Sequence, residues 1–297
     1  MKLPRIRIAH LPTAVEPLPH LSAFLGGPRL WVKRDDQTGL AFGGNKVRKL
    51  EYLLAEALAN GANTLVSVGS VQSNHCRLTA ALAARYQLGC ILVLHGKAAQ
   101  QPSGNLLLDQ LFGAEIVWTT YDKQEVALKD AFARAWETGR RPYLIPLGGS
   151  TPTGALGYAA AFEEFIEQDI IQPDWIVTAS SSGGTQAGLV LGARLANWRG
   201  KILGISIDRS ETDLCQHVAH LATDALHRLR EPIKITPQDV IINADYLGGG
   251  YGVLGDAEVE AIQLFARHEG LLLDPVYTGR AAAGMIDLIR KRYFKPD

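Results

Sequence analysis

Short runs of β-branched and other apolar residues alternate with longer amphipathic segments along almost the whole chain. This alternation is typical of parallel βαβ units joined by right-handed crossovers. It predicts an α/β protein built on open parallel sheets. The predicted strands are Leu30–Lys33, Thr64–Val68, Ile91–His95, Glu115–Thr119, Tyr143–Ile145, Trp175–Ala179 and Ile202–Ile207.

The clearest predicted helix runs from Lys46 to Asn60, because its apolar residues recur at helical spacing and Gly61 follows as a stop signal. Two further helices, Cys76–Arg85 and Thr185–Asn197, each follow a predicted strand after a short polar turn. A chain of 297 residues is expected to form about two domains. The glycine-rich segment 147–154 is the best candidate for a junction between them.

Composition and charge narrow the class of protein. Hydrophobic residues make up 47% of the chain, and 30 basic residues balance 30 acidic ones, so nothing indicates nucleic acid or an anionic membrane as a partner. The three cysteines, Cys76, Cys90 and Cys215, are far apart and form no CxxC pair, which argues against a disulfide framework and a structural zinc site. With no apolar segment of signal or membrane length, we expect a soluble cytoplasmic protein.

Three cations, Lys46, Arg48 and Lys49, stand at the start of the first predicted helix, where the helix dipole disfavours positive charge. Gly43 and Gly44 precede them and permit close backbone approach, so a bound anion or electrophile would explain the placement. Lysine also forms imines with carbonyl groups when a neighbouring cation or burial lowers its pKa. A solvated basic face is the alternative that this segment alone leaves open.

Two more polar segments follow predicted strands, at the edge where open α/β sheets bind ligands. Ser73 and Asn74 precede a helix and could either cap it or hold a carboxylate. The segment from Ser182 to Thr185 lies between a strand and a helix, and its backbone N–H groups and hydroxyls predict a phosphate-binding loop. It lacks the lysine of a nucleoside-triphosphate loop.

Two rival motifs are weaker. Gly250–Gly255 reads GxGxxG and Asp274 follows at about the dinucleotide-binding spacing, but Asp256 and Glu258 would repel a pyrophosphate, so we interpret the segment as a loop that presents Tyr251. A second candidate, a metal site, rests on three histidines without acidic or cysteine neighbours at ligand spacing, and a solvated helix face is the better interpretation. These histidines are His217, His220 and His227.

Together these segments resemble the pyridoxal-phosphate family that contains D-cysteine desulfhydrase and 1-aminocyclopropane-1-carboxylate (ACC) deaminase, over nearly the whole chain. The motifs that carry the resemblance are Lys33–Asp36, Gly39–Tyr52, Gln72–Asn74, Ser182–Gly188 and Asp274–Gly279. The resemblance implies a tryptophan-synthase-β-like fold (fold type II), with two open α/β domains and pyridoxal 5'-phosphate in the cleft. It implies a homodimer, a large domain of residues 1–48 and 155–297, and a small domain of residues 49–154.

The resemblance also implies roles for individual residues. Lys46 would hold the cofactor as a Schiff base, and the residues implied in catalysis are Lys46, Ser73, Tyr251 and Tyr277. Asn74 would contact the pyridine 3-hydroxyl, Tyr277 would stack on the ring, and the phosphate loop would comprise Ser182, Gly183, Gly184 and Thr185. The implied substrate contacts are Ser73, Asn74, His75, Tyr251 and Thr278, and no metal is implied.

The resemblance further implies β-elimination from D-cysteine or a similar small amino acid, since Thr278 stands where the deaminases usually carry glutamate. ACC deaminase is the alternative enzyme. Relatives continue beyond the segment corresponding to Phe294–Asp297, and the loop His95–Gly104 is shorter than theirs. A cofactor-binding protein without turnover is therefore the alternative from another class, and a dinucleotide oxidoreductase rests only on Gly250–Gly255.

Overall fold

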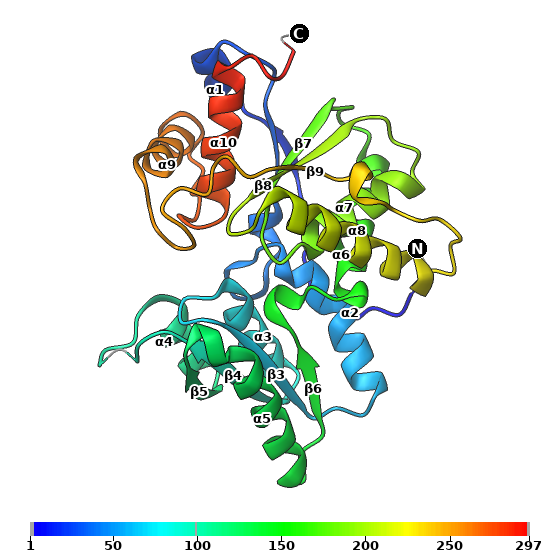
Figure 1. Cartoon of the computed structure of the whole chain (residues 1–297), viewed down its shortest axis with the longest axis vertical. Helices are drawn as coiled ribbons and strands as arrows, with labels where there is room; N and C mark the ends of the chain where they lie inside the picture. The colour runs from blue at the N-terminus through cyan, green and yellow to red at the C-terminus, as the bar shows by residue number, and fades with distance from the viewer. Residues whose placement is uncertain (1–2, 99, 296–297) are drawn as a thin grey trace. The chain divides into compact units, whose positions relative to one another are not determined.

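The computed structural model describes residues 3–98 and 100–295, which form two compact units (Figure 1). Unit 1 comprises residues 1–12 and 35–158, and unit 2 comprises residues 13–34 and 159–297. The domain boundaries expected from the sequence differ from this division for residues 1–12, 35–48 and 155–158, and they stay a prediction. Ala99 in the shortened loop and Pro296 and Asp297 at the chain end lie outside the described residues.

The sheet of unit 1 has four parallel strands in the order β5-β4-β3-β6. Strand β3 is central, and six of its seven residues are buried, as a strand covered on both faces requires. Strand β4 is likewise interior and carries five consecutive buried residues, Cys90–Leu94. The strand bounds are β3 Thr64–Ser70, β4 Gly89–His95, β5 Glu115–Thr119 and β6 Pro142–Ile145.

Alternate residues of this sheet pack on opposite layers of helices. Leu65 and Leu92 face α2 and α3, whereas Val66 and Val93 face α5. This doubly wound arrangement confirms the predicted fold class and places the loops that follow β3 and β4 at one edge of the sheet. The helices are α2 Lys46–Ala59, α3 Asn74–Arg85, α4 Gly104–Leu111 and α5 Gln124–Glu137, and α6 Pro152–Gln168 begins in unit 1 and ends in unit 2.

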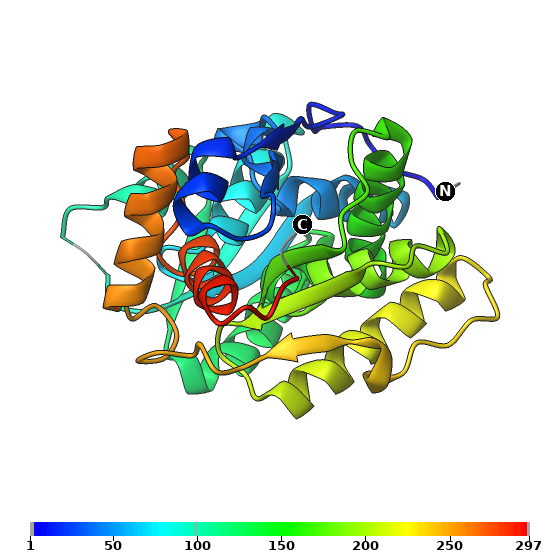
Figure 2. The ribbon, with the colours of Figure 1, turned by 90° about the horizontal axis from the view of Figure 1, so that it is seen from above.

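The sheet of unit 2 has three parallel strands in the order β7-β8-β9. Helices α7 and α8 contact it on one side, and α10 covers the other with Leu288 and Ile289 (Figure 2). Helices α1 and α9 pack on α10. The bounds are β7 Trp175–Ser180, β8 Lys201–Ser206, β9 Ile241–Asn243, α1 Pro19–Leu25, α7 Gly184–Leu195, α8 Glu211–Arg228, α9 Asp256–Glu269 and α10 Thr278–Arg290.

The sequence missed two short strands and assigned one strand to the wrong kind of pairing. Strand β1 (Val15–Pro17) pairs antiparallel with β2 (Trp31–Lys33), so the predicted strand Leu30–Lys33 belongs to a two-stranded antiparallel sheet and not to a parallel one. Strand β9 was not predicted either. Three residues are too few to show either an alternating or a continuous apolar pattern, which explains why these elements escaped detection.

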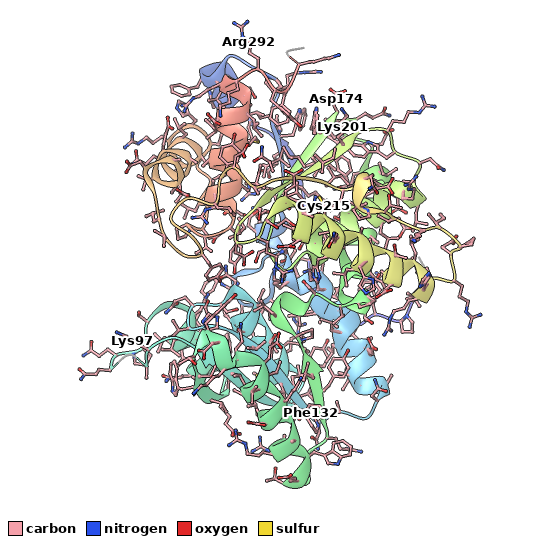
Figure 3. The ribbon with its side chains drawn as sticks, viewed as in Figure 1. Lys97, Phe132, Asp174, Lys201, Cys215 and Arg292 are labelled. Carbon is pink, nitrogen blue, oxygen red and sulfur yellow. The ribbon has the colours of Figure 1, made fainter. Side chains whose placement is uncertain are left out.

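Among the described residues, no helix is both long and apolar enough to cross a bilayer. The three cysteines are free thiols: Cys76 and Cys90 are buried in unit 1, and Cys215 lies on α8 (Figure 3). Burial raises the pKa of the Cys76 thiol to about 12, so this cysteine stays protonated at neutral pH. A buried, protonated thiol is a packing group and not a nucleophile.

Candidate functional site

The polar turn after the central strand of unit 1 is shaped by Ser73 and Asn74. Ser73 is buried and caps α3, since its hydroxyl oxygen accepts a hydrogen bond from the Cys76 backbone N–H at 3.2 Å. The hydroxyl hydrogen of Ser73 is not used in that bond and can be donated elsewhere. Both expectations for Ser73, a cap and a ligand contact, are therefore compatible with this geometry.

The segment before Lys46 has an unusual backbone. Ala41, Phe42, Gly43 and Gly44 all have positive φ, a region that favours glycine, and a Cβ on Gly43 would overlap the carbonyl oxygen of Asp36. The buried hydroxyl of Thr38 holds the segment, because it accepts from the Gly44 N–H at 2.8 Å and lies 3.0 Å from the Gly44 carbonyl oxygen. The backbone just ahead of Lys46 is thereby fixed.

The cations at the start of α2 are compensated in different ways. Arg48 is fully buried and makes two hydrogen bonds of 2.8 Å to the carboxylate of Asp35, which also accepts the Tyr158 hydroxyl at 2.5 Å. Such bidentate, doubly anchored pairs offset the cost of burying a charge. Lys46 is only half buried, and its Nζ lies 3.5 Å from the Asn45 side-chain oxygen.

Lys49, one turn after Lys46, is buried with 1% exposure. Its Nζ lies 3.2 Å from both the Gly148 carbonyl oxygen and the Ser150 hydroxyl. Burial and the nearby charge of Lys46 lower the pKa of Lys49 well below its usual value. The helix start thus carries less positive charge than its three basic residues suggest.

His75 lies beneath the turn, with its ring buried. The hydroxyl of Ser67 donates to the Ile145 carbonyl at 2.8 Å and lies 3.0 Å from His75 Nε2, so Nε2 must donate and Nδ1 carries the lone pair. Burial, Lys46 and Lys49 lower the pKa of His75 well below its usual value. Its Nδ1 has no hydrogen-bond partner among the described residues. The predicted substrate contact of His75 is untested, and a neutral ring would not attract a carboxylate.

The loop between β7 and α7 in unit 2 has the features of an anion site. Gly183 has φ +77°, and a Cβ there would overlap the ring of His217. Gly184 and Thr185 then start α7, whose first turn has no acidic residue. Backbone N–H groups at a helix start favour an anion. His217, which the sequence assigned to a solvated helix face, is half buried and lies 3.3 Å from the Ser182 carbonyl oxygen.

Tyr251 and Tyr277 lie together in unit 2. Their hydroxyl oxygens are 2.7 Å apart, and their rings meet edge to face. Burial, followed by the contact with Tyr251, raises the pKa of Tyr277 above its usual value. The pair therefore shares a hydrogen bond while Tyr277 keeps its proton at neutral pH.

The loop that carries Tyr251 is fixed by Arg280, which is buried. Arg280 donates to Glu258 at 2.8 Å and to the carbonyl oxygens of Gly250 and Val253 at 3.0 and 2.9 Å. Arg280 thus holds the loop backbone by hydrogen bonds, and no strand ends directly before the loop. The GxGxxG motif therefore does not follow a strand as the dinucleotide-binding turn does.

Thr278 is exposed at the start of α10 and bound to Asp274. Its hydroxyl lies 2.8 Å from the Asp274 Oδ1 atom, which also accepts the Thr278 backbone N–H at 2.8 Å. Asp274 Oδ2 accepts the N–H groups of Val276 and Tyr277. This acidic side chain caps α10 and orients the Tyr277–Thr278 turn.

Sequence reasoning missed several groups that support these segments. An isolated acidic or amide residue in a loop has many ordinary roles and gives no clear signal. Asp35 lies within a motif of the resemblance, whereas Thr38 and Asn105 lie outside those motifs. The missed residues are Asp35, Thr38, Asn105, Asp109 and Tyr158, and for His217 the contact with Ser182 was missed.

The described residues include no group of three or more histidine, cysteine or acidic side chains that could hold a metal ion. Residues 6–297 match the family model of pyridoxal-phosphate dependent enzymes. The chain therefore belongs to this family, and its cofactor is pyridoxal 5'-phosphate.

Solved structures agree with this assignment. An ACC deaminase homologue is 38% identical with a TM-score of 0.89, over 98% of this chain and 88% of that one. A pyridoxal 5'-phosphate-dependent aspartate racemase (17% identity, TM-score 0.67, covering 94% and 85%) shares the fold. So does the L-serine ammonia-lyase of Rhizomucor miehei (16%, 0.70, 97% and 91%).

The residues within each unit fit the chemistry of this cofactor. In unit 2, the close contact of Gly183 with His217 leaves no room for a side chain at the start of α7, as a backbone phosphate site requires. In unit 1, the strained segment held by Thr38 presents Lys46, an amine able to form an imine with an aldehyde. The start of α7 therefore fits a phosphate group, and Lys46 fits an aldehyde.

Proposed function

We propose that the protein catalyses β-elimination from D-cysteine or a similar small amino acid, giving pyruvate, ammonia and sulfide. We further propose that Lys46 binds the cofactor aldehyde and that Ser182, Gly183, Gly184 and Thr185 bind its phosphate. When bound, the cofactor supplies an electron sink for the pair left on the substrate α-carbon. The expected assembly is a cytoplasmic homodimer.

The residues of the chain have the following proposed parts. The amine of Lys46, released when substrate binds, removes the α-proton. The Ser73 hydroxyl, whose oxygen already accepts the Cys76 N–H, donates its hydrogen to the substrate carboxylate. Tyr277 stacks on the cofactor ring, and its hydroxyl shares a proton with Tyr251, which faces the substrate.

The observation that carries the choice of substrate is the pairing of Thr278 with Asp274. The Thr278 hydroxyl donates a hydrogen bond to Asp274 Oδ1 at 2.8 Å, and position 278 itself offers no carboxylate to a substrate. A glutamate there would stand beside a carboxylate that already caps α10, and the two charges would repel each other. The absence of an acidic group beside Tyr277 favours elimination of a thiol, which needs no extra acid at that place, over opening of a cyclopropane ring.

ACC deaminase activity is the second candidate, because a structure described as an ACC deaminase homologue is 38% identical to this chain. We expect the purified holoenzyme to release pyruvate and sulfide from D-cysteine and to leave ACC unchanged. Release of 2-oxobutanoate from ACC, without turnover of D-cysteine, would contradict the proposal. L-Cysteine serves as the stereochemical control in the same pyruvate assay.

The site assignment is tested separately by borohydride reduction and peptide mapping. Reduction converts the imine into a stable secondary amine, so the label should be found on Lys46. The variant K49A is the matched control, since it removes the neighbouring lysine of the same helix and should keep the label. A label on another lysine would overturn the assignment of Lys46, whatever the substrate.

A further inference from the structure

Asn105 stands at the start of α4 and contacts Asn74, the residue proposed to meet the pyridine oxygen of the cofactor. Its Nδ2 atom donates to the Asn74 Oδ1 at 2.8 Å and to the Gln72 backbone carbonyl at 2.9 Å. Its Oδ1 accepts from the Arg77 guanidinium at 3.4 Å. Asn105 thus links the Gln72 carbonyl and the Arg77 guanidinium to the Asn74 amide in one chain of hydrogen bonds.

The direction of this chain is fixed by its ends. A backbone carbonyl can only accept and a guanidinium can only donate, so Asn105 must place Nδ2 toward Gln72 and Oδ1 toward Arg77. Turning the Asn105 amide would set its oxygen against the Gln72 carbonyl. Asn74 must then use Oδ1 to accept from Asn105, which leaves its own Nδ2, with two N–H groups, for a ligand.

Asn105 itself is held in place by Gln72. The Gln72 Oε1 atom accepts the Asn105 backbone N–H at 2.8 Å, and its Nε2 donates to the Ser103 carbonyl at 3.0 Å. Gly104, with φ +57°, makes this approach possible, because a Cβ there would overlap Gln72 Oε1. The start of α4 is thereby fastened to the turn that carries Asn74.

We infer that Asn105 is a positioning residue that fixes the Asn74 amide as a hydrogen-bond donor to the pyridine oxygen of the cofactor. This inference rests on the proposed function. The pyridine oxygen carries negative charge beside the imine of Lys46, so a donor stabilises it, whereas an amide turned the other way would present a repelling carbonyl. Donation to this oxygen also stabilises the deprotonated imine and so lowers the imine pKa.

The variant N105D inverts the chain. Its carboxylate still accepts from Arg77 but loses the bond to the Gln72 carbonyl and replaces the Nδ2 donor, so Asn74 must turn its own Nδ2 toward position 105 and its carbonyl toward the cofactor. We expect at least about tenfold weaker cofactor binding, from the loss of a hydrogen bond to a charged group. The visible absorbance of the bound cofactor should titrate at a higher pH than in the unchanged protein. N105A, which releases Asn74 without inverting it, should shift both readouts less.

Two further variants separate an effect on cofactor binding from a general loss of stability. N74D retains the bond from Asn105 but has no donor for the pyridine oxygen, so it should reproduce the shifts of N105D. N63D is the matched control, because the Asn63 side chain uses its Oδ1 atom in the bonds to Arg141 and Thr64, and a carboxylate preserves them. Arg77 and Asp109, the charged neighbours of the network, are unchanged throughout.

The affinity and the titration decide the inference, with thermal unfolding as the check on folding. If N105D and N74D both bind the cofactor with unchanged affinity and titrate at the unchanged pH, Asn105 does not position Asn74. A failure of the proposed cofactor site, the part of the proposed function on which this inference depends, is distinguishable, since the unchanged protein would then show no borohydride label on Lys46. Label on Lys46 with no effect of N105D overturns the positioning role alone.

Discussion

The starts of α2 and α7 are both proposed to bind the cofactor, but they are built in opposite ways. Helix α2 begins with three cations, of which Arg48 is paired with Asp35 and Lys49 is buried with a lowered pKa. Helix α7 begins with Gly184 and Thr185, and its first turn bears no acidic residue. The first helix start depends on charged side chains, whereas the second offers its backbone.

This difference has a consequence for mutation. A site made of side-chain charge depends on the partners that compensate it, which lie far from the ligand. A site made of backbone N–H groups depends on conformation, and therefore on the absence of a side chain at one glycine. The two regions should accordingly fail by different routes, the first through stability and the second through affinity.

The largest expected effect is on α2, from the variant R48M. Removing the guanidinium takes from the largely buried Asp35 carboxylate both of its hydrogen bonds to Arg48, so we expect the free energy of unfolding to fall by about 3–5 kcal/mol. Urea unfolding measures this. The control is R140M, which breaks the exposed pair with Glu115 and should cost about 0–1 kcal/mol. Equal losses in the two variants would show that the Arg48 pair compensates nothing.

A smaller effect is expected at α7, from the variant G183A. Alanine in the left-handed region costs about 1–2 kcal/mol, and its Cβ would also overlap His217 and displace the loop. We expect weaker cofactor binding in addition to this loss. G113A is the matched control, because Gly113 also has φ +77° but a Cβ added there would meet no atom within 4 Å. If the two variants bind the cofactor equally well, the loop around Gly183 does not hold the phosphate.

The same two regions show how far sequence alone can lead. The run from Ser182 to Thr185 was predicted to bind phosphate from its place between a strand and a helix, and this stays a prediction; the structure places it after β7 and at the start of α7, as the sequence indicated. The loop's contact with His217 was missed, because it depends on how α8 packs on α7. For α2, the sequence indicated an excess of charge at the helix start but not what compensates it.

The charge of Arg48 is compensated by Asp35, which Tyr158 in turn supports from a distant part of the chain. Tyr158 lies 123 positions from Asp35, and the two meet only in the folded unit. Most of the parallel strands were predictable, because short β-branched and apolar runs alternate with longer amphipathic segments. The three-residue strands β1 and β9 were not, since pairing and not pattern defines them.

The smallest expected effect concerns Lys49, and it tests how much positive charge the start of α2 carries. Because burial lowers its pKa below the unfolded value of about 10.4, the unfolded chain binds more protons at intermediate pH, and stability rises with pH in that range. The variant K49M removes this dependence along with two hydrogen bonds. We expect it to be about 1 kcal/mol more stable than the unchanged protein at pH 7.

That advantage should shrink as the pH rises and level off only above about 10.4, where Lys49 loses its proton in the unfolded chain as well. Urea unfolding at several pH values, taken as the difference between the two proteins, cancels the titration of the cysteines. Lys46 and His75 face Lys49. The pKa of His75 is lowered below about 6.5, so any effect of Lys49 on the titration of His75 is confined to acidic pH. K129M, at an exposed position of α5, should differ by less than about 0.5 kcal/mol at every pH. A constant difference for K49M would mean that Lys49 is buried with its charge, and α2 would then carry all three cations.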